Sequence, residues 1–419
     1  MAQRLVVIGQ GYVGLPLALR AVDAGFDVVG LDTDEQRVKR LGSGDSYVDD
    51  IPSERLATAL ATNRYLPTCD YADAAGFDIC VITVPTPLRD GVPDLRHVED
   101  SARAVAPFLR RGCLVVLEST TYPGTTEELL LPALTEHSGL GAPGDFLLGY
   151  SPERIDPGNP LWRLENTPKI VSGLDDDSVA AVRDFYTLLV DRPVPVSSLA
   201  VAELIKLIEN TFRHVNIALI NEIAVFAEQL GIDVWEAIDG AATKPFGYLP
   251  FRPGPGVGGH CLPVDPSYLS WRVKSTLGHN FRFVELANDI NDHMPDHVVR
   301  RVTAGLNARR KPVNGSRVLL LGLAYKKNTG DLRESPALAV VAALRKLGAE
   351  VRAVDPHVEP LHVPGDVGLV ELAERELRAA DAVVVLADHD EFDYALIERA
   401  SSYVFDTRNR CHGLEVERL

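Results

Sequence analysis

The sequence has few cysteines and no cysteine pair at the spacing of a metal or redox motif. Its 419 residues include five cysteines, which are scattered along the chain. An odd, scattered set argues against a disulfide framework and against a zinc site built on paired cysteines. We therefore expect a reduced, cytoplasmic protein without a bound metal.

The sequence also lacks an excess of positive charge. Lys and Arg number 42 against 59 Asp and Glu, and the formal net charge is −17. Nucleic acids and acidic membranes favour a basic partner, so neither is expected to bind. Small anionic ligands remain compatible, because a few local Arg and Lys side chains can hold them.

No long apolar run is present. None approaches the roughly 18 residues of a membrane helix, and the run after Arg4 is too short for a secretory signal. We therefore expect no membrane partner. Hydrophobic residues make up 46% and charged residues 24%, as in ordinary globular proteins, and the length suggests two or three domains.

The N-terminal segment reads as strand, glycine turn, helix and strand. Residues 4–8 are apolar, as in a strand buried on both faces, and Gly9-Gln-Gly-Tyr-Val-Gly14 follows. Residues 15–24 are helix-like, and the strand at 26–31 ends at Asp32. A glycine turn in this context, with an acid about twenty residues further on, predicts a dinucleotide site.

This turn predicts NAD as the cofactor. Its glycines let the pyrophosphate reach the helix N-terminus, where free N–H groups bind it. Asp32 would accept hydrogen bonds from the adenosine ribose and repel a 2′-phosphate, whereas nearby Arg37 weakens that preference for NAD over NADP. The candidate residues of the turn are Gly9, Gly11, Tyr12, Val13 and Gly14.

Further strands are expected at 78–84, 114–118 and 147–150, each followed by a polar or Pro-rich turn. Ligands of doubly wound sheets bind at the carboxyl ends of strands, so these turns are the expected cofactor and substrate edge. Taken singly, each Ser or Thr is better explained by turn or capping chemistry. The candidates are Pro85, Thr86, Ser119, Thr120, Glu153 and Arg154.

The pattern changes between Ser197 and Gly231. Apolar residues recur at spacings of three and four without an internal Gly or Pro, which predicts one long helix. Lys206 and Asn210 are four residues apart and project from one face. Taken alone, this pair is better explained as a solvated Lys beside a capping-type Asn. Residues 232–300 are expected to be mostly helical.

One loop interrupts that helical region. The segment 253–266 carries four prolines and four glycines around Cys261. Such a segment excludes helix and lets the backbone approach a ligand closely. A cysteine held there, with His260 before it and Asp265 after it, is a candidate nucleophile, whereas cysteine is otherwise often a small buried hydrophobe.

A second strand–helix–strand pattern begins near residue 317. A strand at 317–324, a helix at 336–347 and a strand at 350–355 repeat the N-terminal order, and strands at 382–386 and 403–405 follow. Lysines replace the glycines of the first turn. Lys326 and Lys327 suit a phosphate ligand held by side chains, unless they are solvated surface lysines.

Together, these segments resemble the nucleotide-sugar dehydrogenases of the UDP-glucose/GDP-mannose dehydrogenase family, and the resemblance covers the whole chain. The motifs that carry it are Gly9-Gln-Gly-Tyr-Val-Gly-Leu-Pro, Glu118-Ser-Thr, Ser151-Pro-Glu-Arg, Lys206-Leu-Ile-Glu-Asn, Gly258-Gly-His-Cys-Leu-Pro-Val-Asp and Lys326-Lys-Asn-Thr-Gly-Asp-Leu-Arg-Glu-Ser-Pro. The resemblance implies an α/β fold with two Rossmann-like, doubly wound domains joined by a long central helix and a helical middle domain. The expected domains are an NAD-binding domain at 1–196, a central domain with the cysteine loop and a dimer interface at 197–305, and a UDP-binding domain at 306–419.

The resemblance also implies a reaction. The family oxidises the C6 hydroxyl of a nucleotide sugar to a carboxylate with two NAD and one water, and releases no free aldehyde. Cys261 would trap the aldehyde as a thiohemiacetal, and a second oxidation would give a thioester that water hydrolyses. Lys206 and Asn210 would stabilise the developing oxyanions. Thr120, Asp265 and Glu153 would handle water and protons, and which of them is the base stays open.

The substrate side follows by the same resemblance. Lys326 and Arg408 match positions that grip the UDP diphosphate, and Arg333 is expected to be structural or on the cofactor side. Further substrate-binding candidates are Glu153, Arg154, Lys206, Asn210, Arg213 and Gly258, together with Lys244 or Arg252 from a neighbouring subunit.

Two departures point to one branch of the family. UDP-glucose members follow Ser-Pro-Glu with an aromatic residue and later a second Glu, where this chain has Arg154 and Pro157. The segments around Arg154, Arg213 and Lys244 resemble the branch that acts on UDP-N-acetylhexosamines. Within it UDP-N-acetylglucosamine is favoured over UDP-N-acetylmannosamine, although no residue can be argued to distinguish these epimers.

Other functions are weaker alternatives. UDP-glucose oxidation is opposed by the two departures, and a two-electron hydroxyacid-type dehydrogenase would need no cysteine in a glycine-rich loop. A non-catalytic NAD-binding regulator would have lost Cys261, Lys206 or Asp265, and all three are present. A homodimer or larger homo-oligomer, built on the long helix and residues 232–300, is expected.

Overall fold

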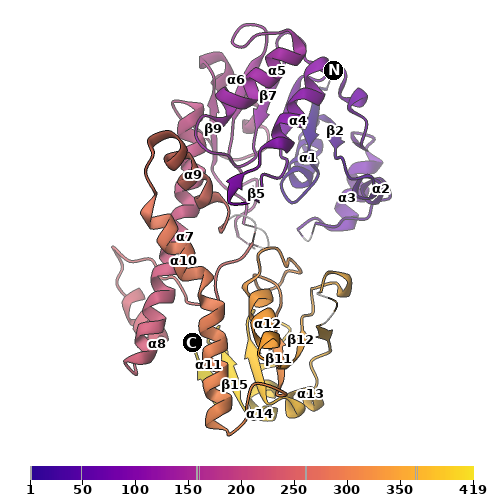
Figure 1. Cartoon of the computed structure of the whole chain (residues 1–419). Coiled ribbons are helices and arrows are strands. Elements are labelled where there is room, and N and C mark those ends of the chain that lie inside the picture. The colour runs from indigo at the N-terminus through magenta and orange to yellow at the C-terminus, as the bar shows by residue number, and fades with distance from the viewer. Residues whose placement is uncertain are drawn as a thin grey trace. The chain divides into compact units, whose positions relative to one another are not determined.

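The computed structural model describes residues 2–48, 50–156, 159, 161–259, 262–363, 365 and 367–419. The chain divides into two compact units (Figure 1). The first comprises Met1–Glu209 with Ser267–His279, and the second comprises Asn210–Pro266 with Asn280–Leu419. Each unit is built around its own sheet.

The sheet of the first unit has the strand order β10-β9-β8-β7-β4-β1-β2-β3. The strands from β1 to β8 run parallel, and β9 is antiparallel to β8. The strands are β1 (Arg4–Ile8), β2 (Asp27–Leu31), β3 (Tyr65–Thr68), β4 (Ile79–Ile82), β7 (Leu114–Leu117), β8 (Leu147–Tyr150), β9 (Lys169–Gly173) and β10 (Pro193–Pro195). The first six of them have the 3-2-1-4-5-6 order of dinucleotide-binding sheets.

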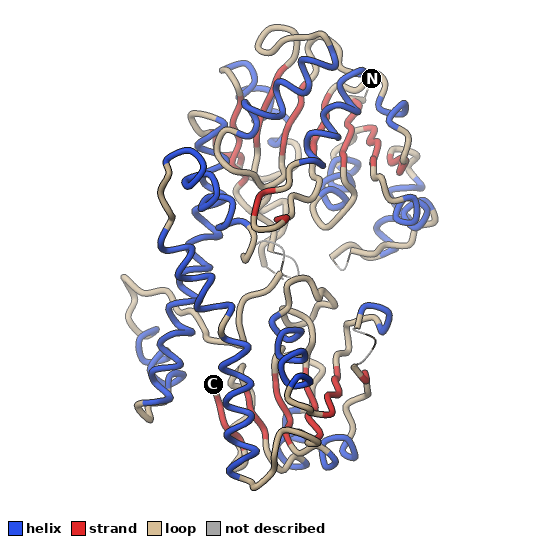
Figure 2. The backbone as a smooth tube through the Cα atoms, viewed as in Figure 1, coloured by secondary structure: helices blue, strands red, loops and turns tan. Residues whose placement is uncertain are grey.

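Helices lie on both faces of this sheet (Figures 1 and 2). They are α1 (Gly14–Asp23), α2 (Glu35–Gly42), α3 (Ser53–Ala61), α4 (Arg96–Val105), α5 (Leu131–Ser138) and α6 (Asp176–Thr187), with a small hairpin of β5 (Leu88–Arg89) and β6 (Val92–Pro93). The first strand is buried along most of its length because both faces are covered: Leu5 and Val6 are both 0% exposed.

The sheet of the second unit has the order β13-β12-β11-β14-β15-β16, and all its pairs are parallel. Counted from its own first strand, this is again 3-2-1-4-5-6. The strands are β11 (Arg317–Leu321), β12 (Glu350–Val354), β13 (Gly368–Leu369), β14 (Ala382–Val385), β15 (Val404–Asp406) and β16 (Val416–Arg418). Successive residues of β11 enter different core clusters, Val318 in one and Leu319 in the other, so this sheet too is buried on both faces.

Helices complete the second unit. Ser335 caps α12 by accepting the N–H of Ala337 and donating its hydroxyl to the Leu323 carbonyl at 2.6 Å, which ties the helix to the end of β11. The helices are α8 (Val234–Ala242), α10 (Arg282–Asp292), α11 (Met294–Ala308), α12 (Pro336–Lys346), α13 (Glu374–Ala379) and α14 (Tyr394–Ala400).

The predicted long helix is present as α7 (Leu199–Gln229), with 31 residues. At about 1.5 Å per residue it is roughly 46 Å long. The boundary between the units falls inside it, between Glu209 and Asn210. A further helix, α9 (Asp265–Leu277), follows the cysteine loop.

The α/β fold class and both doubly wound sheets are confirmed, with strand and helix ends within a few residues of prediction. The sequence analysis did not anticipate β3, β9 and β10 of the first sheet or β13 and β16 of the second. Among the described residues, no helix is long and apolar enough to cross a membrane.

Candidate active site

The glycine turn after β1 is shaped for a phosphate group. Gly9 has φ +92°, and a Cβ on Gly14 would lie 1.8 Å from the Gly9 carbonyl oxygen. A Cβ on Gly11 would meet no atom within 4 Å. The outer glycines are therefore needed for the turn and for close packing of α1, whereas Gly11 faces open space into which a pyrophosphate can approach.

Asp32, at the end of β2, is bonded to this turn. Its Oδ2 accepts the N–H of Gln10 at 2.8 Å, and its Oδ1 accepts the N–H of Asp34 at 3.0 Å. Arg37 lies beside it, with Nη1 3.7 Å from Asp32 Oδ2. An acid fixed next to the glycine turn fits the adenosine ribose of NAD, so the residues present suit the predicted cofactor.

The turns after β4 and β7 are held together by side chains. Ser119 donates its hydroxyl to the Val84 carbonyl at 2.7 Å. Tyr268 donates to the Thr86 carbonyl at 2.8 Å. These bonds place Thr86 and Ser119 at one edge of the first sheet, close to the ends of neighbouring strands. Tyr12 and Pro85 are exposed, and Val13 and Thr120 are half-buried.

The turn after β8 contacts the first part of α7. Lys206 donates from Nζ to the main-chain carbonyl of Glu153 at 2.6 Å. Arg154 binds Glu209, with Nη2 2.6 Å from Oε1. Lys206 is 7% exposed, so its ammonium is directed at the turn rather than into solvent. The structure thus brings Glu153, Arg154 and Lys206 together within the first unit.

A buried charged cluster underlies this turn, and the sequence analysis assigned it no role. Lys169, at the start of β9, lies 3.1 Å from Glu118 Oε1 and 3.7 Å from Glu153 Oε2. Glu118 belongs to a motif noted in the sequence, but Lys169 lies in no motif. A lysine between an apolar strand and a proline gives no signal that it will be buried beside two acids.

In the second unit, Asn210 donates from Nδ2 to Asp265 Oδ2 at 2.5 Å. Asp265 is 4% exposed and is the first residue of α9. Cys261 and His260 lie outside the described residues, as does Pro157. The pairing of Asn210 with Asp265 joins two of the predicted catalytic positions.

The approach to the cysteine loop packs against the predicted diphosphate residues. A Cβ on Gly258 would lie 2.7 Å from the Tyr325 Cβ, and one on Gly254 would lie 2.7 Å from Arg408 Nη1. Gly259 donates its N–H to the Arg333 carbonyl at 3.0 Å. Arg408 also donates from Nε to the Leu386 carbonyl at 2.8 Å. No side chain fits at Gly254 or Gly258, because the loop after β11 and the side chain of Arg408 fill the space.

The loop after β11, which carries half-buried Lys326, is fixed by the loop after β14. Asn328 donates its N–H to His389 Nδ1 at 2.9 Å, and His389 Nε2 lies 3.2 Å from Asp355 Oδ2. Tyr325 donates its N–H to the Asp331 carbonyl at 3.1 Å. The lysine predicted to bind phosphate is therefore carried on a well-supported loop.

Three other predicted substrate residues are exposed: Arg213, Lys244 and Arg252. Arg252 pairs with Asp239 at 2.5 Å, and Lys244 lies 5.0 Å from the ring centroid of Phe246. Their roles stay predictions.

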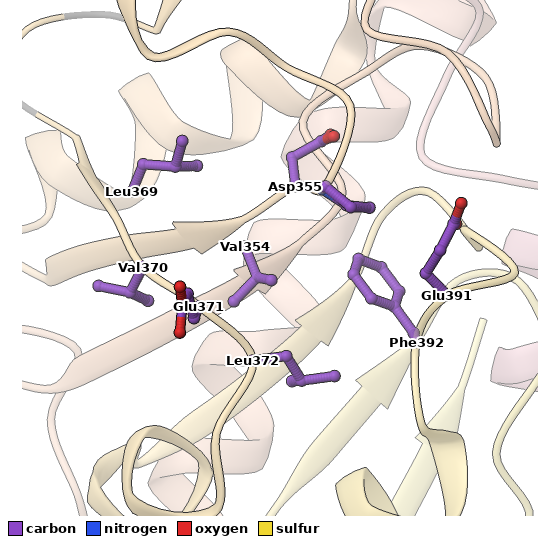
Figure 3. Close-up of a pocket in the computed structure, with 9 residues that line it drawn as sticks. Val354, Asp355, Leu369, Val370, Glu371, Leu372, Glu391 and Phe392 are labelled. Atoms are coloured by element: carbon purple, nitrogen blue, oxygen red, sulfur yellow. The ribbon is translucent and has the colours of Figure 1, made fainter.

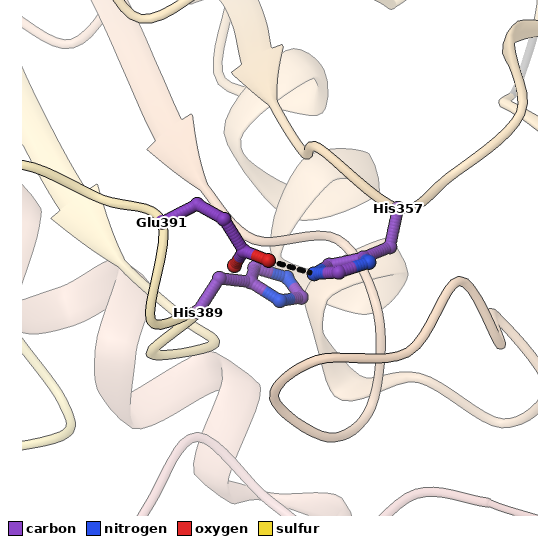
Figure 4. Close-up of side chains that lie close together, drawn as sticks. All are labelled: His357, His389 and Glu391. Atoms are coloured by element: carbon purple, nitrogen blue, oxygen red, sulfur yellow. Dashed lines mark ion pairs between the residues drawn. The ribbon is translucent and has the colours of Figure 1, made fainter. Parts of the chain in front are cut away.

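Beside this loop lies a pocket of about 350 Å³ at the carboxyl end of β12 (Figure 3). Its lining includes Val354, Val370 and Phe392. Nearby, His357, His389 and Glu391 are close enough to hold a metal ion (Figure 4). Both ring nitrogens of His389 already have protein partners, so the cluster supports the loop and does not indicate a metal centre.

A glycine turn with an acid at the end of the next strand, on a sheet of dinucleotide-binding order, is typical of an NAD-binding domain. The chain belongs to the UDP-glucose/GDP-mannose dehydrogenase family. The models of its NAD binding, central and UDP binding domains match residues 3–190, 200–293 and 319–413. The protein is accordingly an NAD-dependent nucleotide-sugar dehydrogenase with a UDP-binding domain.

Relatives with this fold and length are known. The chain is 37% identical over 392 residues to UDP-N-acetyl-D-mannosamine dehydrogenase of Pyrococcus horikoshii, covering 93% of this chain and 90% of that protein. It is 35% identical to UDP-N-acetyl-D-glucosamine 6-dehydrogenase of Pseudomonas aeruginosa, covering 93% and 91%. The solved structure of UDP-D-ManNAc dehydrogenase from Pyrococcus horikoshii matches with a TM-score of 0.90 and 34% identity over 99% of each chain.

Proposed function

We propose that the protein oxidises the C6 hydroxyl of a UDP-N-acetylhexosamine, with UDP-N-acetylglucosamine favoured, to the uronic acid in a four-electron reaction. The observation that best supports this substrate class is the contact of Arg154 with Glu209, in which Nη2 lies 2.6 Å from Oε1. It joins two of the three segments by which the chain resembles the N-acetylhexosamine branch, those around Arg154 and Arg213, and UDP-glucose members have an aromatic residue where this chain has Arg154. Three of the relatives at 35–37% identity are named for N-acetylated or N-acetyl-derived sugars.

The proposed route uses Cys261 as the nucleophile. Oxidation of the C6 alcohol releases a hydride and a proton and gives an aldehyde. Addition of the Cys261 thiol gives a thiohemiacetal, a second loss of hydride and proton gives a thioester, and water then releases the carboxylate and the thiol. NAD supplies the hydride acceptor for both oxidations when bound.

The chain's polar groups are assigned to charge and proton handling. The Lys206 ammonium donates one hydrogen to Glu153 and has two more, and the Asn210 amide has a second N–H beyond the one it gives Asp265. These remaining donors are proposed to stabilise the oxyanions of C6. Thr120, Glu153 and Asp265 are proposed to handle water and protons, and Lys326 and Arg408 to bind the UDP diphosphate.

The experiment mixes the enzyme with excess NAD and limiting UDP-N-acetylglucosamine and counts NADH per sugar. About two per sugar, with Cys261→Ser stopping near or below one, supports the proposal. Two NADH from UDP-N-acetylmannosamine or UDP-glucose instead would overturn the substrate assignment only. One NADH per sugar with intact Cys261 would overturn the thioester route.

UDP-N-acetylmannosamine is the second candidate. The observation that favours it is the match to the Pyrococcus horikoshii enzyme named for that sugar, by sequence and by structure. The same NADH count with this epimer decides between the two.

We also propose that the chain consists of three domains, at 1–196, 197–305 and 306–419. We further propose that the protein is a homodimer. An apolar stripe is exposed along α7, and heptad-like spacing of this kind suits pairing with the same face of a second copy. The stripe consists of Phe212, Leu219, Ile223 and Phe226 on α7 and Leu230 directly after it, between 42% and 73% exposed.

Light scattering at micromolar protein should give a dimer mass or a multiple of it. Phe226→Glu should shift the mass to the monomer, because it places a charge within the stripe. Leu361→Glu, at a 92% exposed leucine outside the stripe, is the matched control. A wild-type monomer would overturn the proposal.

A further inference from the structure

Lys169 is a cation enclosed by protein beneath the turn that carries Glu153. Its side chain is 3% exposed. Its Nζ lies 3.1 Å from Glu118 Oε1 and 3.7 Å from Glu153 Oε2, and it donates to the Pro152 carbonyl at 3.2 Å. These partners follow the ends of the two neighbouring strands β7 and β8, and Lys169 itself begins β9, which pairs with β8. A lysine is rarely buried in this way unless acids balance its charge.

The cluster contains more acid than base. Glu118 and Glu153 share one ammonium, and Tyr186 adds a hydroxyl that donates to Glu118 Oε1. The Tyr186 ring centroid lies 5.1 Å from Lys169 Nζ. Burial raises the pKa of Glu118, Lys169 lowers it and Glu153 raises it further. The pKa of Glu118 is raised overall, and Lys169 is the cation that faces both carboxylates.

Glu153 is held at three of its atoms. Its Oε2 is the one nearest Lys169, while its Oε1 accepts the N–H groups of Arg154 and Ile155. Its main-chain carbonyl accepts Lys206 Nζ at 2.6 Å. Lys169 and Lys206 thus hold the same residue, one through the carboxylate and one through the backbone. A displacement of the turn would move the Lys206 ammonium along with the Glu153 carboxylate.

We propose that Lys169 is a positioning residue for the reaction. Its ammonium orients the Glu153 carboxylate and offsets its charge. Through the Glu153 main chain, it also fixes the position of Lys206. The proposal rests on the proposed function, in which Glu153 handles water and protons and Lys206 stabilises an oxyanion. Lys169 itself touches neither substrate nor cofactor in this proposal. Its effect is therefore expected in turnover and its pH dependence more than in substrate affinity.

The pH dependence follows from the groups that face Glu153. They are Lys169 on β9, Glu118 directly after β7, Tyr186 on α6, Lys206 on α7, and the neighbouring Arg154, which is paired with Glu209. Among the described residues, Lys169 forms the ion pair of the Glu153 carboxylate, at 3.7 Å. Its removal takes an opposite charge away from a position 3.7 Å from this carboxylate, so the acid limb of the turnover profile should move to higher pH.

The test compares Lys169→Met and Lys169→Arg with the wild-type full-length enzyme. For Lys169→Met we expect kcat to fall by roughly 10- to 100-fold, part of the usual contribution of a positioned acid or base. The acid limb should move up by about one pH unit or more, as expected on losing an opposite charge within ~4 Å. KM for the nucleotide sugar should stay within about threefold. Lys169→Arg keeps the charge and should restore the limb and most of kcat.

A purely structural lysine gives a different result. A fall in activity that follows a lower melting temperature, with an unchanged pH profile, would overturn the proposal, and so would unchanged kcat in Lys169→Met. If that variant does not fold, the double variant Lys169→Met with Glu118→Gln takes its place, because it removes the buried acid that has lost its cation. The acid limb of its turnover profile should still be shifted. Lys346→Met, at an exposed lysine of α12, is the control.

Separate measurements test the proposed function and the positioning role of Lys169. The wild-type NADH count per sugar tests the four-electron route, and the pH profiles of the Lys169 variants are measured with whichever nucleotide sugar the wild type oxidises. An NADH count of one with a shifted limb in Lys169→Met would overturn the route and support the positioning role. An NADH count of two, with the acid limb of Lys169→Met unshifted, would support the four-electron route and overturn the positioning role.

Discussion

The two sheets of this protein begin their first turn in the same way and then diverge. After β1, Gly9 has φ +92°, and after β11, Gly322 has φ +85°. The next N–H in each case donates to the acid that ends the second strand: Gln10 to Asp32 at 2.8 Å and Leu323 to Asp355 at 2.7 Å. The same bridge therefore closes both turns, although only one lies in a glycine-rich fingerprint.

The two acids differ in how many donors they receive. A carboxylate has about four acceptor positions. Asp32 accepts two N–H groups from its surroundings among the described residues, with Arg37 alongside. Asp355 accepts four backbone N–H groups, and His389 lies 3.2 Å away as well. Asp355 is thus saturated by the protein, whereas Asp32 keeps capacity for a ribose.

The turns differ further along. Five residues after Gly9 stands Gly14, where α1 begins, and five residues after Gly322 stands Lys327. Helix α12 begins only at Pro336. The second turn therefore has no helix N-terminus directly behind it to bind phosphate, and a diphosphate there needs side chains. One fold can thus hold two nucleotides by different means.

Two glycines test the first turn, with the largest expected effect. Gly14→Val should lower the activity more than about 100-fold and destabilise the first unit, because even a Cβ would lie 1.8 Å from the Gly9 oxygen. Gly11→Ala should leave the melting temperature unchanged, since its Cβ meets nothing within 4 Å, yet raise the KM for NAD by about tenfold or more. Thermal unfolding and NAD titration measure the two effects. A Gly11→Ala enzyme with normal NAD binding would contradict this account of the turn.

The two acids form the next comparison. Asp355→Ala should cost about 3–5 kcal/mol of folding free energy, because several buried N–H groups and His389 lose their acceptor. Asp32→Ala should cost about 1–2 kcal/mol and act mainly on NAD binding. Denaturant unfolding and NAD titration of both variants check this. Equal stability losses would show that the saturation of Asp355 is unimportant.

Stability at low pH should report Asp355. Burial would raise the pKa of Asp355, but His389 and the backbone N–H groups outweigh it and lower the pKa to about 2. Since this is below the ordinary value of 3.8, the stabilisation is present above about pH 4 and is lost as the pH falls toward 2. It amounts to about 2 kcal/mol. Unfolding of wild type and Asp355→Asn between pH 5 and 2.5 should converge, and a constant gap would refute the assignment.

Sequence reasoning succeeded where the determinants are local. The glycine turn, Asp32 and the long helix follow from spacing within about thirty residues, and so does the strand that ends at Asp355. It did not find the partner of Asp355, because His389 lies 34 residues away in the chain. It also missed Lys169, whose burial depends on Glu118 from another strand 51 positions earlier. Periodicity shows which residues are apolar, but it does not show which charged side chains the sheet encloses.

The smallest expected effect concerns the cofactor's 2′ position. The Asp32 carboxylate should repel a 2′-phosphate, while Arg37, 3.7 Å from it and half-exposed, could accept one. In Asp32→Ser the repulsion is gone and Arg37 keeps only its pair with Asp34, 3.5 Å away, so the ratio of kcat/KM for NADP to that for NAD should rise by about 10- to 100-fold, mainly through KM. The double variant Asp32→Ser with Arg37→Ala should lose most of that gain. If the single and double variants have the same ratio, Arg37 does not read the 2′-phosphate, and Asp32 alone sets the preference for NAD.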